Sequence, residues 1–346
     1  MPGKNQIILM GEMGKEIRRM HFSEEDIFKI KSDEEFQSLA LEMYRFHYEN
    51  NPVYRTFSAS LKRNSGNVDT LEKIPFLPVE FFKEHKIYAA PGEPEMVFTS
   101  TGTGGLGTSH HYVASLNLYR ESFLRSFRLF YGDPSEYCIL GLLPSYLERT
   151  GSSLVYMVDK LVKLSGHPGS GFFLYNQEEL AEVLLKLEQN HQPSLLFGVT
   201  FALLDFAEKH PVNLSSTIVM ETGGMKGRRK ELVREEVHEI LCRRFSIEMV
   251  HSEYGMTELL SQAYSKGKGI FSAPPWMKVF VRDPYDPLNL LEPGKTGGIN
   301  IIDLANIWSC PFIATGDLGL LHADGSFEIF GRMDQAEIRG CSLMVL

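Results

Sequence analysis

The sequence has no apolar run that approaches the roughly 20 residues of a membrane-spanning helix. Its N-terminus also lacks the basic, apolar and small-residue order of a secretory signal peptide. We therefore expect a protein without a membrane span that works in the cytoplasm.

The sequence also has fewer positively charged than negatively charged side chains. The chain has 35 Lys and Arg residues against 44 Asp and Glu residues, and its net charge is -9. Binding many phosphates along a nucleic acid requires clustered Lys and Arg. The composition therefore excludes a broad nucleic-acid surface.

Cysteine is scarce and scattered. The four cysteines, Cys138, Cys242, Cys310 and Cys341, include no Cys-x-x-Cys pair, which argues against a zinc site and against a disulfide framework. The chain also lacks a Gly-x-x-x-x-Gly-Lys phosphate loop and the Gly-x-Ser-x-Gly elbow of many serine hydrolases. A serine hydrolase is therefore not expected.

Three regions that differ in sequence pattern predict an α/β fold. Residues 1–93 indicate a helical N-terminal part, with helix starts capped by Ser23 and Ser32 and a stop at Asn51-Pro52. Residues 94–270 alternate short apolar runs with amphipathic stretches, typical of a nucleotide-binding core with a largely parallel sheet flanked by helices on both faces. Residues 271–346 indicate a small β-rich subdomain.

The expected elements of these regions can be named by residue range. In the core, we expect strands over 96–99, 137–143, 194–199, 217–221 and 248–250, and helices over 116–130, 178–190 and 229–244. In the β-rich part, we expect strands over 278–281, 298–303, 318–322 and 327–330, with a hairpin turn at 323–325.

A stretch rich in glycine and hydroxyl groups follows the first apolar run of the core. It consists of Thr99, Ser100, Thr101, Gly102, Thr103, Gly104 and Gly105. Glycines let backbone N–H groups approach phosphate oxygens, and hydroxyls add further donors. The stretch is either a phosphate-binding loop at the carboxyl end of a sheet strand or a flexible turn.

Three later clusters offer further groups for a nucleotide. Thr257 places a hydroxyl beside the carboxylate of Glu258, which suits phosphate contact and magnesium binding, although such a pair is also common as a helix cap. Asp317 offers an acceptor for ribose hydroxyls, and Arg332 offers a guanidinium for phosphate or ribose.

In order along the chain, residues 99–105, 254–258, 315–317 and 331–334 resemble the core motifs of the adenylate-forming enzymes, the acyl-CoA synthetase and luciferase superfamily. Within it, the chain looks most like the LuxE-type acyl-protein synthetases, through residues 74–78 with 82–83, 143–149 with 151–154, and 337–342. The resemblance covers nearly the whole chain and implies the large N-terminal domain of that superfamily.

The resemblance implies an ATP- and Mg²⁺-dependent reaction in two steps. A carboxylic acid, for this family a fatty acid, attacks the α-phosphate to give an acyl adenylate, and a thiol then takes the acyl group. Residues 99–105 would hold the β and γ phosphates, Thr257 the α-phosphate and Glu258 the metal ion. Further contacts to adenine and ribose would come from Gly223, Gly224, Tyr254, Gly255, Asp317 and Arg332.

Two departures from the superfamily pattern stand out. The first motif lacks its usual Pro-Lys-Gly ending, so His110 or His111 either supplies the charge or is a packing or surface residue. The chain also stops twelve residues after Asp334, so the usual C-terminal domain with its catalytic lysine is expected to be absent.

The last cysteine has two interpretations. In LuxE-type synthetases, a cysteine near the C-terminus accepts the acyl group as a thioester and passes it to a reductase partner, and Cys341 matches that position. Alternatively, Cys341 packs in a final strand. The other three cysteines are expected in the core.

Two other functions stay open. One is an acyl-CoA or aryl-CoA ligase, which gives the acyl group to coenzyme A or to an acyl carrier. The other is a non-catalytic nucleotide-binding protein.

Overall fold

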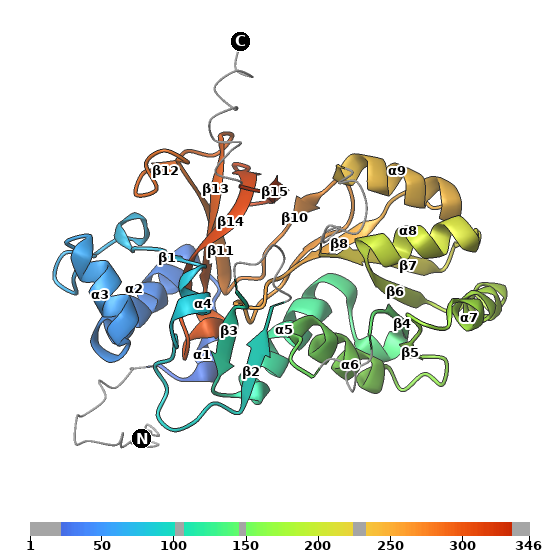
Figure 1. The fold of residues 1–346 in the computed structure, drawn as a ribbon, viewed down its shortest axis with the longest axis horizontal. Helices are drawn as coiled ribbons and strands as arrows, with labels where there is room; N and C mark the ends of the chain where they lie inside the picture. The colour runs from blue at the N-terminus through green and yellow to red at the C-terminus, as the bar shows by residue number, and fades with distance from the viewer. Residues whose placement is uncertain (1–21, 101–106, 145–149, 224–232, 334–346) are drawn as a thin grey trace, which may run out of the picture.

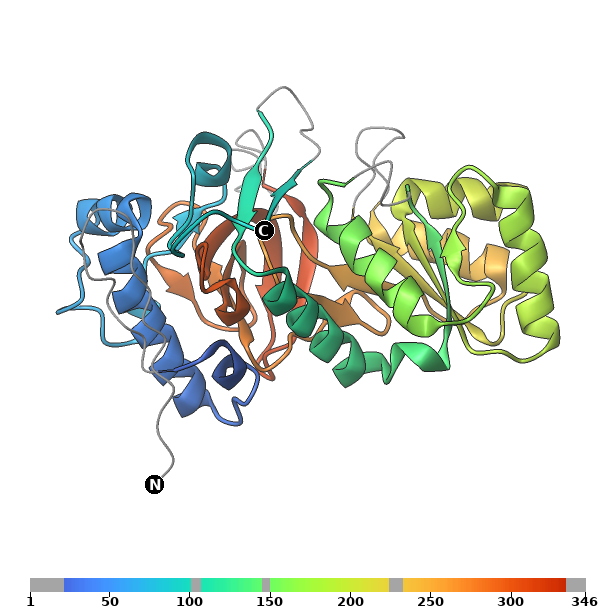
Figure 2. The ribbon, with the colours of Figure 1, turned by 90° about the horizontal axis from the view of Figure 1, so that it is seen from below.

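The computed structural model describes residues 22–100, 107–144, 150–223 and 233–333. Within these ranges two large sheets lie side by side, and a two-stranded ribbon lies between them (Figures 1 and 2). Buried apolar residues form one continuous cluster that joins the N-terminal helices to both sheets.

The N-terminal helices begin where capping residues predict. They are α1 (Glu24–Ile27), α2 (Asp33–Asn50) and α3 (Pro52–Ser60). The Ser32 hydroxyl accepts a hydrogen bond from the Glu35 N–H, and Asn51 ends α2 and caps α3. The predicted helix starts and the stop at Asn51-Pro52 are confirmed.

The first sheet is the expected parallel one. Its strands are β5 (Gly171–Phe172), β4 (Cys138–Leu142), β6 (Ser194–Val199), β7 (Thr217–Thr222), β8 (His251–Tyr254) and β9 (Ala263–Ser265), in this spatial order. All neighbours run parallel except β8 and β9. Residues of β4 and β6 are buried throughout, as expected for strands covered on both faces.

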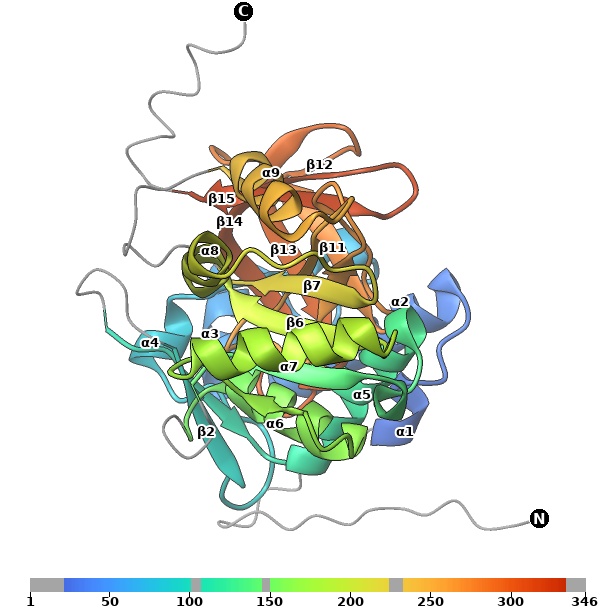
Figure 3. The same ribbon diagram turned by 90° about the vertical axis from the view of Figure 1, so that its right-hand side faces the viewer.

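Helices cover both faces of this sheet, as the alternating pattern predicts (Figures 1 and 3). They are α5 (Leu116–Tyr131), α6 (Ser153–Ser165), α7 (Gln177–Gln189), α8 (Thr200–Lys209) and α9 (Arg234–Phe245). The connections through α7, α8 and α9 all step across the sheet in one direction, and the connection through α6 steps back, so the right-handed crossover rule puts α7, α8 and α9 on one face and α6 on the other. Helix α5 packs with α6 through rings such as Tyr119 and Tyr156.

The second sheet is largely antiparallel and forms the β-rich part. Its strands are β10 (Ile270–Phe271), β15 (Phe327–Arg332), β14 (Phe312–Leu321), β13 (Thr296–Asp303), β11 (Met277–Arg282) and β12 (Leu290–Leu291), with β1 (Leu77–Pro78) parallel to β14. The predicted turn at 323–325 joins β14 to β15. Short helical elements complete the described fold: η1 (Leu71–Lys73), α4 (Phe81–Glu84), η2 (Pro134–Glu136) and η3 (Leu304–Asn306).

One predicted strand is present but pairs outside the parallel sheet in which it was expected. Met96–Thr99 forms β2, which pairs antiparallel with β3 (His110–Val113) in the separate ribbon and not in the parallel sheet. The two strands are close in sequence, so their pairing closes only a short loop. The glycine-rich motif therefore follows a ribbon strand.

Two other strand boundaries were wrong. We expected a strand at 248–250, but β8 begins at His251, so Tyr254 lies in the strand and not after it. We expected the strand near Asp317 to begin at residue 318, but β14 begins at Phe312. Polar residues in both segments interrupt the run of apolar residues that predicts a strand. Their side chains contact residues that are distant in sequence and close only in the folded chain.

The third helix of the core also begins later than expected. The pattern predicted 229–244, and the described helix is Arg234–Phe245.

Among the described helices, none combines the length and apolar character that a bilayer crossing requires.

Candidate active site

Two of the predicted residues face each other in the second sheet. Asp317 on β14 and Arg332 on β15 are register partners, and 3.6 Å separates Arg332 Nη1 from Asp317 Oδ1. Gly316 permits this arrangement, since a Cβ there would lie 3.2 Å from Arg332 Nη2. The Asp317 side chain is only 10% exposed, whereas the Arg332 side chain is 66% exposed and open to a ligand.

Tyr254 connects this pair to the first sheet. Its hydroxyl donates a hydrogen bond of 2.8 Å to Asp317 Oδ2. Burial raises the pKa of Asp317, and the charges of Arg332 and Arg282 lower it. Arg282, at the end of β11, donates to the Thr315 carbonyl at 2.6 Å, which holds the backbone two residues before Asp317.

Glu258 belongs to the same group of charges. It is 5% exposed, and burial raises its pKa, while Arg332 lowers that pKa and Asp317 raises it. The Ser109 side chain lowers the pKa of Glu258, which places it near that carboxylate, and the Ser109 N–H donates to Ser100 Oγ at 3.0 Å. Ser109 thus lies between Ser100 of the glycine-rich motif and the carboxylate predicted to bind the metal ion.

Two buried side chains, those of His111 and Asn306, contact the backbone carbonyls of Thr257 and Glu258. His111 Nδ1 lies 2.7 Å from the Thr257 carbonyl oxygen, and Nε2 lies 2.9 Å from Asn306 Oδ1. Asn306 Nδ2 in turn donates to the Glu258 carbonyl at 2.7 Å. Complete burial lowers the pKa of His111 to about 4, so the ring is neutral near pH 7.

For one of the two histidines, His111, the structure supports the packing interpretation; nothing in the described contacts tests His110. His111 is a buried packing residue, and the neutral ring does not replace the missing lysine of the first motif. Its role in the site is to hold Thr257 and Glu258. Sequence reasoning missed Ser109 and Asn306, because neither lies in a recognisable motif and both act through contacts across the chain.

Three more of the predicted residues lie at the end of a strand or directly after one. Thr99 ends β2, and its N–H donates to the Gly151 carbonyl at 2.7 Å. Gly223 follows β7, and its carbonyl accepts from Thr200 Oγ1 at 2.9 Å. Gly255 is exposed directly after β8. Seven predicted residues lie outside the described residues: Thr101, Gly102, Thr103, Gly104, Gly105, Gly224 and Cys341.

Two of the three described cysteines lie in the core, as expected. Cys138 and Cys310 are buried, and Cys242 is partly exposed. Burial raises the pKa of all three thiols, that of Cys310 to about 12. Each is therefore a poor nucleophile near neutral pH.

The sequence assigns one carboxylate, that of Glu258, to a metal ion. Among the described residues, no group of three or more His, Cys, Asp and Glu side chains could hold a metal ion. Mg²⁺ in nucleotide sites commonly uses one or two carboxylates together with phosphate oxygens and water. The single carboxylate of Glu258 fits that kind of site.

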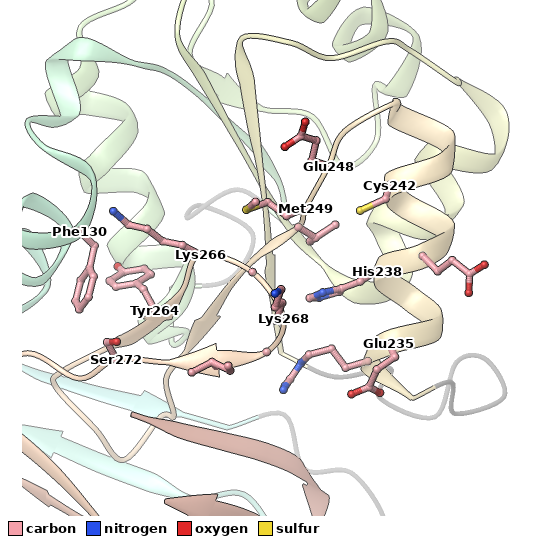
Figure 4. Close-up of a pocket in the computed structure, with 16 residues that line it drawn as sticks. Phe130, Glu235, His238, Cys242, Glu248, Met249, Tyr264, Lys266, Lys268 and Ser272 are labelled. Carbon is pink, nitrogen blue, oxygen red and sulfur yellow. The ribbon is translucent and has the colours of Figure 1, made fainter. Parts of the chain in front are cut away.

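A separate cavity of about 740 Å³ lies beside α9 (Figure 4). Its lining includes His238, Cys242, Tyr264, Lys266 and Lys268. None of the residues predicted to bind ATP lines it. The cavity and the convergent group around Asp317 are therefore different places in the fold.

Comparison with known proteins identifies the family. The model of the family described as acyl-protein synthetase, LuxE, matches residues 10–346. A long-chain-fatty-acid–luciferin-component ligase from Vibrio harveyi is 25% identical over 326 residues, which cover 87% of this chain and 84% of that protein. The resemblance read from the motifs is confirmed.

Solved structures confirm the fold. An open conformation of 2-hydroxyisobutyryl-CoA ligase, in complex with 2-HIB-AMP and CoA, superposes with a TM-score of 0.62 at 14% identity, over 88% of this chain and 75% of that one. ATP-bound MatB from Rhodopseudomonas palustris gives a TM-score of 0.54 at 17% identity, over 71% of this chain. The match covers 50% of the length of MatB.

Proposed function

This chain belongs to the LuxE family of acyl-protein synthetases, and on that basis we propose that it activates a carboxylic acid with ATP and transfers the acyl group to a thiol. The relative from Vibrio harveyi is named as a long-chain-fatty-acid ligase, which supports a fatty acid as the substrate. The adenylate-forming fold supports ATP as the second substrate.

The observation that carries this proposal is the convergence of Tyr254, Asp317, Arg332 and Glu258. Asp317 has the acceptor oxygens that ribose hydroxyls need, and its bond to Tyr254 holds the carboxylate in place. Arg332 presents an exposed guanidinium next to it. These residues would bind the nucleoside and orient its phosphates toward Glu258.

In the first step, a carboxylate oxygen of the acid forms a bond to the α-phosphorus, and the bond from that phosphorus to pyrophosphate breaks. The Thr257 hydroxyl donates to an α-phosphate oxygen, where negative charge increases in the transition state. Glu258 would hold Mg²⁺, which neutralises phosphate charge when bound. His111 and Asn306 keep the backbone of this pair in position.

In the second step, a thiolate attacks the acyl carbon and AMP leaves. Cys341 is the proposed nucleophile, and the thioester then passes the acyl group to an acyl reductase or an acyl carrier. The described cysteines are unsuited to this step, because burial raises the pKa of each thiol.

Two assays test the proposal on the purified full chain. With ATP, Mg²⁺ and a panel of fatty acids, we expect carboxylate-dependent exchange of labelled pyrophosphate into ATP. With a labelled acid, we expect label on the protein that hydroxylamine removes. If no acid supports pyrophosphate exchange while the protein still binds AMP, the result favours a non-catalytic nucleotide-binding protein.

Cysteine variants separate the two steps. Cys341→Ser should keep pyrophosphate exchange and lose the hydroxylamine-sensitive label, whereas Cys242→Ser, at the partly exposed thiol of α9, should keep both. Equal labelling of wild type and Cys341→Ser contradicts the thioester step. A sharp rise in pyrophosphate release on addition of coenzyme A would instead indicate an acyl-CoA ligase.

A further inference from the structure

A group of hydrogen-bonding side chains lies between the cavity beside α9 and the carboxyl end of β7. Its members are Thr200 at the start of α8, Glu221 on β7, His238 on α9 and Ser252 on β8. His238 also lines the cavity (Figure 4). Glu221 and Ser252 are register partners, so their side chains share the face of the sheet that α9 covers. None of the four is among the residues predicted to bind ATP.

The Glu221 carboxylate is buried at the centre of this group. It is 6% exposed, and its Oε2 atom lies 2.9 Å from His238 Nε2 and 3.5 Å from Ser252 Oγ. An ionised carboxylate only accepts hydrogen bonds, so the proton of the shorter contact sits on the imidazole Nε2. A buried carboxylate without donors is costly. His238 therefore supplies the main donor to Oε2.

The Thr200 hydroxyl connects the other carboxylate oxygen to the main chain of Gly223. Thr200 Oγ1 lies 2.9 Å from the Gly223 carbonyl oxygen and 3.3 Å from Glu221 Oε1. A hydroxyl has one proton, so these two acceptors compete for it. Because His238 already donates to the carboxylate, the proton of Thr200 is left for the nearer acceptor, the Gly223 carbonyl.

Gly223 lies at the end of the sheet where the nucleotide is proposed to bind. The last register pair of β7 and β8 precedes Gly223 and Tyr254 by one residue, so the chain leaves β7 at the level of Tyr254. The Tyr254 hydroxyl donates to Asp317, the carboxylate proposed to bind ribose. The φ angle of Gly223 is 70°, a left-handed conformation that favours glycine. The bond from Thr200 to its carbonyl fixes the direction of this turn.

We propose that His238 and Thr200 are positioning residues for the nucleotide site and that Glu221 couples them. His238 satisfies the buried carboxylate, Thr200 then holds the Gly223 carbonyl, and the turn after β7 keeps the shape that bound adenine requires. This inference rests on the proposed function, since it assumes that ATP binds beside Gly223 and Tyr254. It assigns the binding of ATP, and not the chemical step, to this group.

The first test removes the Thr200 hydroxyl. Thr200→Val keeps the size and branching of the side chain and should raise KM for ATP by about three- to tenfold, the effect of one hydrogen bond, with kcat and KM for the acid nearly unchanged. Thr200→Ser keeps the hydroxyl and should give a KM close to that of wild type. Pyrophosphate exchange at varied ATP and acid concentrations measures these constants. Equal KM values for Thr200→Val and Thr200→Ser contradict the inference.

Thr217 provides a matched control on the same strand. Its hydroxyl donates to Glu188 Oε1 at 2.6 Å, at the amino end of β7 and away from Gly223. Thr217→Val also removes one hydrogen bond, and it should leave KM for ATP unchanged. Thermal unfolding shows whether the two valine variants are equally stable. The same rise in KM for ATP in both variants would show a general loss of stability and overturn the inference.

The competition for the Thr200 proton gives an independent test. His238→Phe keeps an aromatic ring and removes the donor to Glu221, so the carboxylate attracts the Thr200 hydroxyl and KM for ATP should rise by about three- to tenfold. Adding Glu221→Leu to this variant removes the competing acceptor and should restore the KM. A double variant that binds ATP as weakly as His238→Phe contradicts the coupling through Glu221. If His238→Phe does not fold, the comparison of Thr200→Val with Thr200→Ser decides.

Calorimetric titration with ATP separates this inference from the proposed function. Titration requires no acid substrate, so the affinities of wild type and Thr200→Val test the positioning role even when no acid supports exchange. A wild type that activates an acid, and whose ATP affinity equals that of Thr200→Val, overturns the inference alone. A wild type that does not bind ATP overturns the proposed function, and the inference fails with it.

Discussion

The Tyr254 hydroxyl donates to Asp317 Oδ2 at 2.8 Å, and this bond joins β8 of the parallel sheet to β14 of the antiparallel sheet. The same carboxylate faces Arg332 across the β14–β15 pair. One buried carboxylate thus connects both sheets and an exposed guanidinium. A ligand held by these three side chains would depend on how the two sheets are placed relative to one another.

The first prediction concerns Asp317. Asp317→Asn should lower kcat/KM for ATP by roughly 10- to 100-fold, because a hydrogen bond to a charged group contributes about 1.5–3 kcal/mol. Tyr254→Phe keeps the ring and should cost less, roughly three- to tenfold. Pyrophosphate exchange at varied ATP concentrations measures both. Equal activity of Asp317→Asn and wild type would remove Asp317 from the site.

The second prediction concerns Glu258 and magnesium. Glu258→Gln should lower kcat for adenylation by about 100-fold or more, as loss of a group that stabilises transition-state charge does. Glu292→Gln, on the exposed β12–β13 turn, should have no effect. Since burial raises the pKa of Glu258, protons should compete with Mg²⁺ at higher pH than at an exposed glutamate, and KM for Mg²⁺ should rise as pH falls. A pH-independent KM for Mg²⁺ would contradict metal binding here.

The third prediction separates two adjacent histidines. His111→Gln removes the ring that contacts the Thr257 carbonyl and Asn306, so kcat should fall by about 10- to 100-fold through misplacement of Thr257, with a smaller change in KM for ATP. His110→Gln, one residue earlier and partly exposed, should be nearly neutral. Thermal unfolding of both variants checks that the difference is not global. Similar kcat values for the two variants would exclude positioning by His111.

The fourth prediction concerns stability at acid pH. Complete burial lowers the pKa of His47 to about 4, and its Nε2 lies 2.8 Å from the Ile307 carbonyl oxygen. Between about pH 6.5 and 4 the unfolded chain binds a proton at His47 that the folded chain does not, so stability is lost as pH falls. At about 1.4 kcal/mol per pKa unit, the loss is on the order of 3 kcal/mol.

The control for this prediction is His47→Gln. Denaturant unfolding of wild type and variant at a series of pH values gives the difference in unfolding free energy. The destabilisation caused by the variant should be largest near neutral pH and shrink toward pH 4. A difference that does not change with pH would show that His47 keeps its ordinary pKa.

Several elements could be predicted from local sequence because the signals are local. The Ser32 hydroxyl caps α2 by accepting a hydrogen bond from the N–H of Glu35, three residues later. The apolar run within Ser194–Val199 predicts a strand covered on both faces. The strand around Asp317 was predicted too short, because residues 315–317 interrupt the apolar residues on either side, and Asp317 pairs with Tyr254 and Arg332, which are distant in sequence or on another strand. Local signals cannot report partners that are distant in sequence.

The sequence by itself determined the order of α and β elements, the capped helix starts and the motifs that identify the family, since all of these depend on neighbouring residues. Only the tertiary structure decided that β2 pairs with β3, that Tyr254 reaches Asp317, and that His111 and Asn306 hold Thr257 and Glu258. These contacts join residues up to about two hundred positions apart, and the packing of two sheets and a ribbon brings them together.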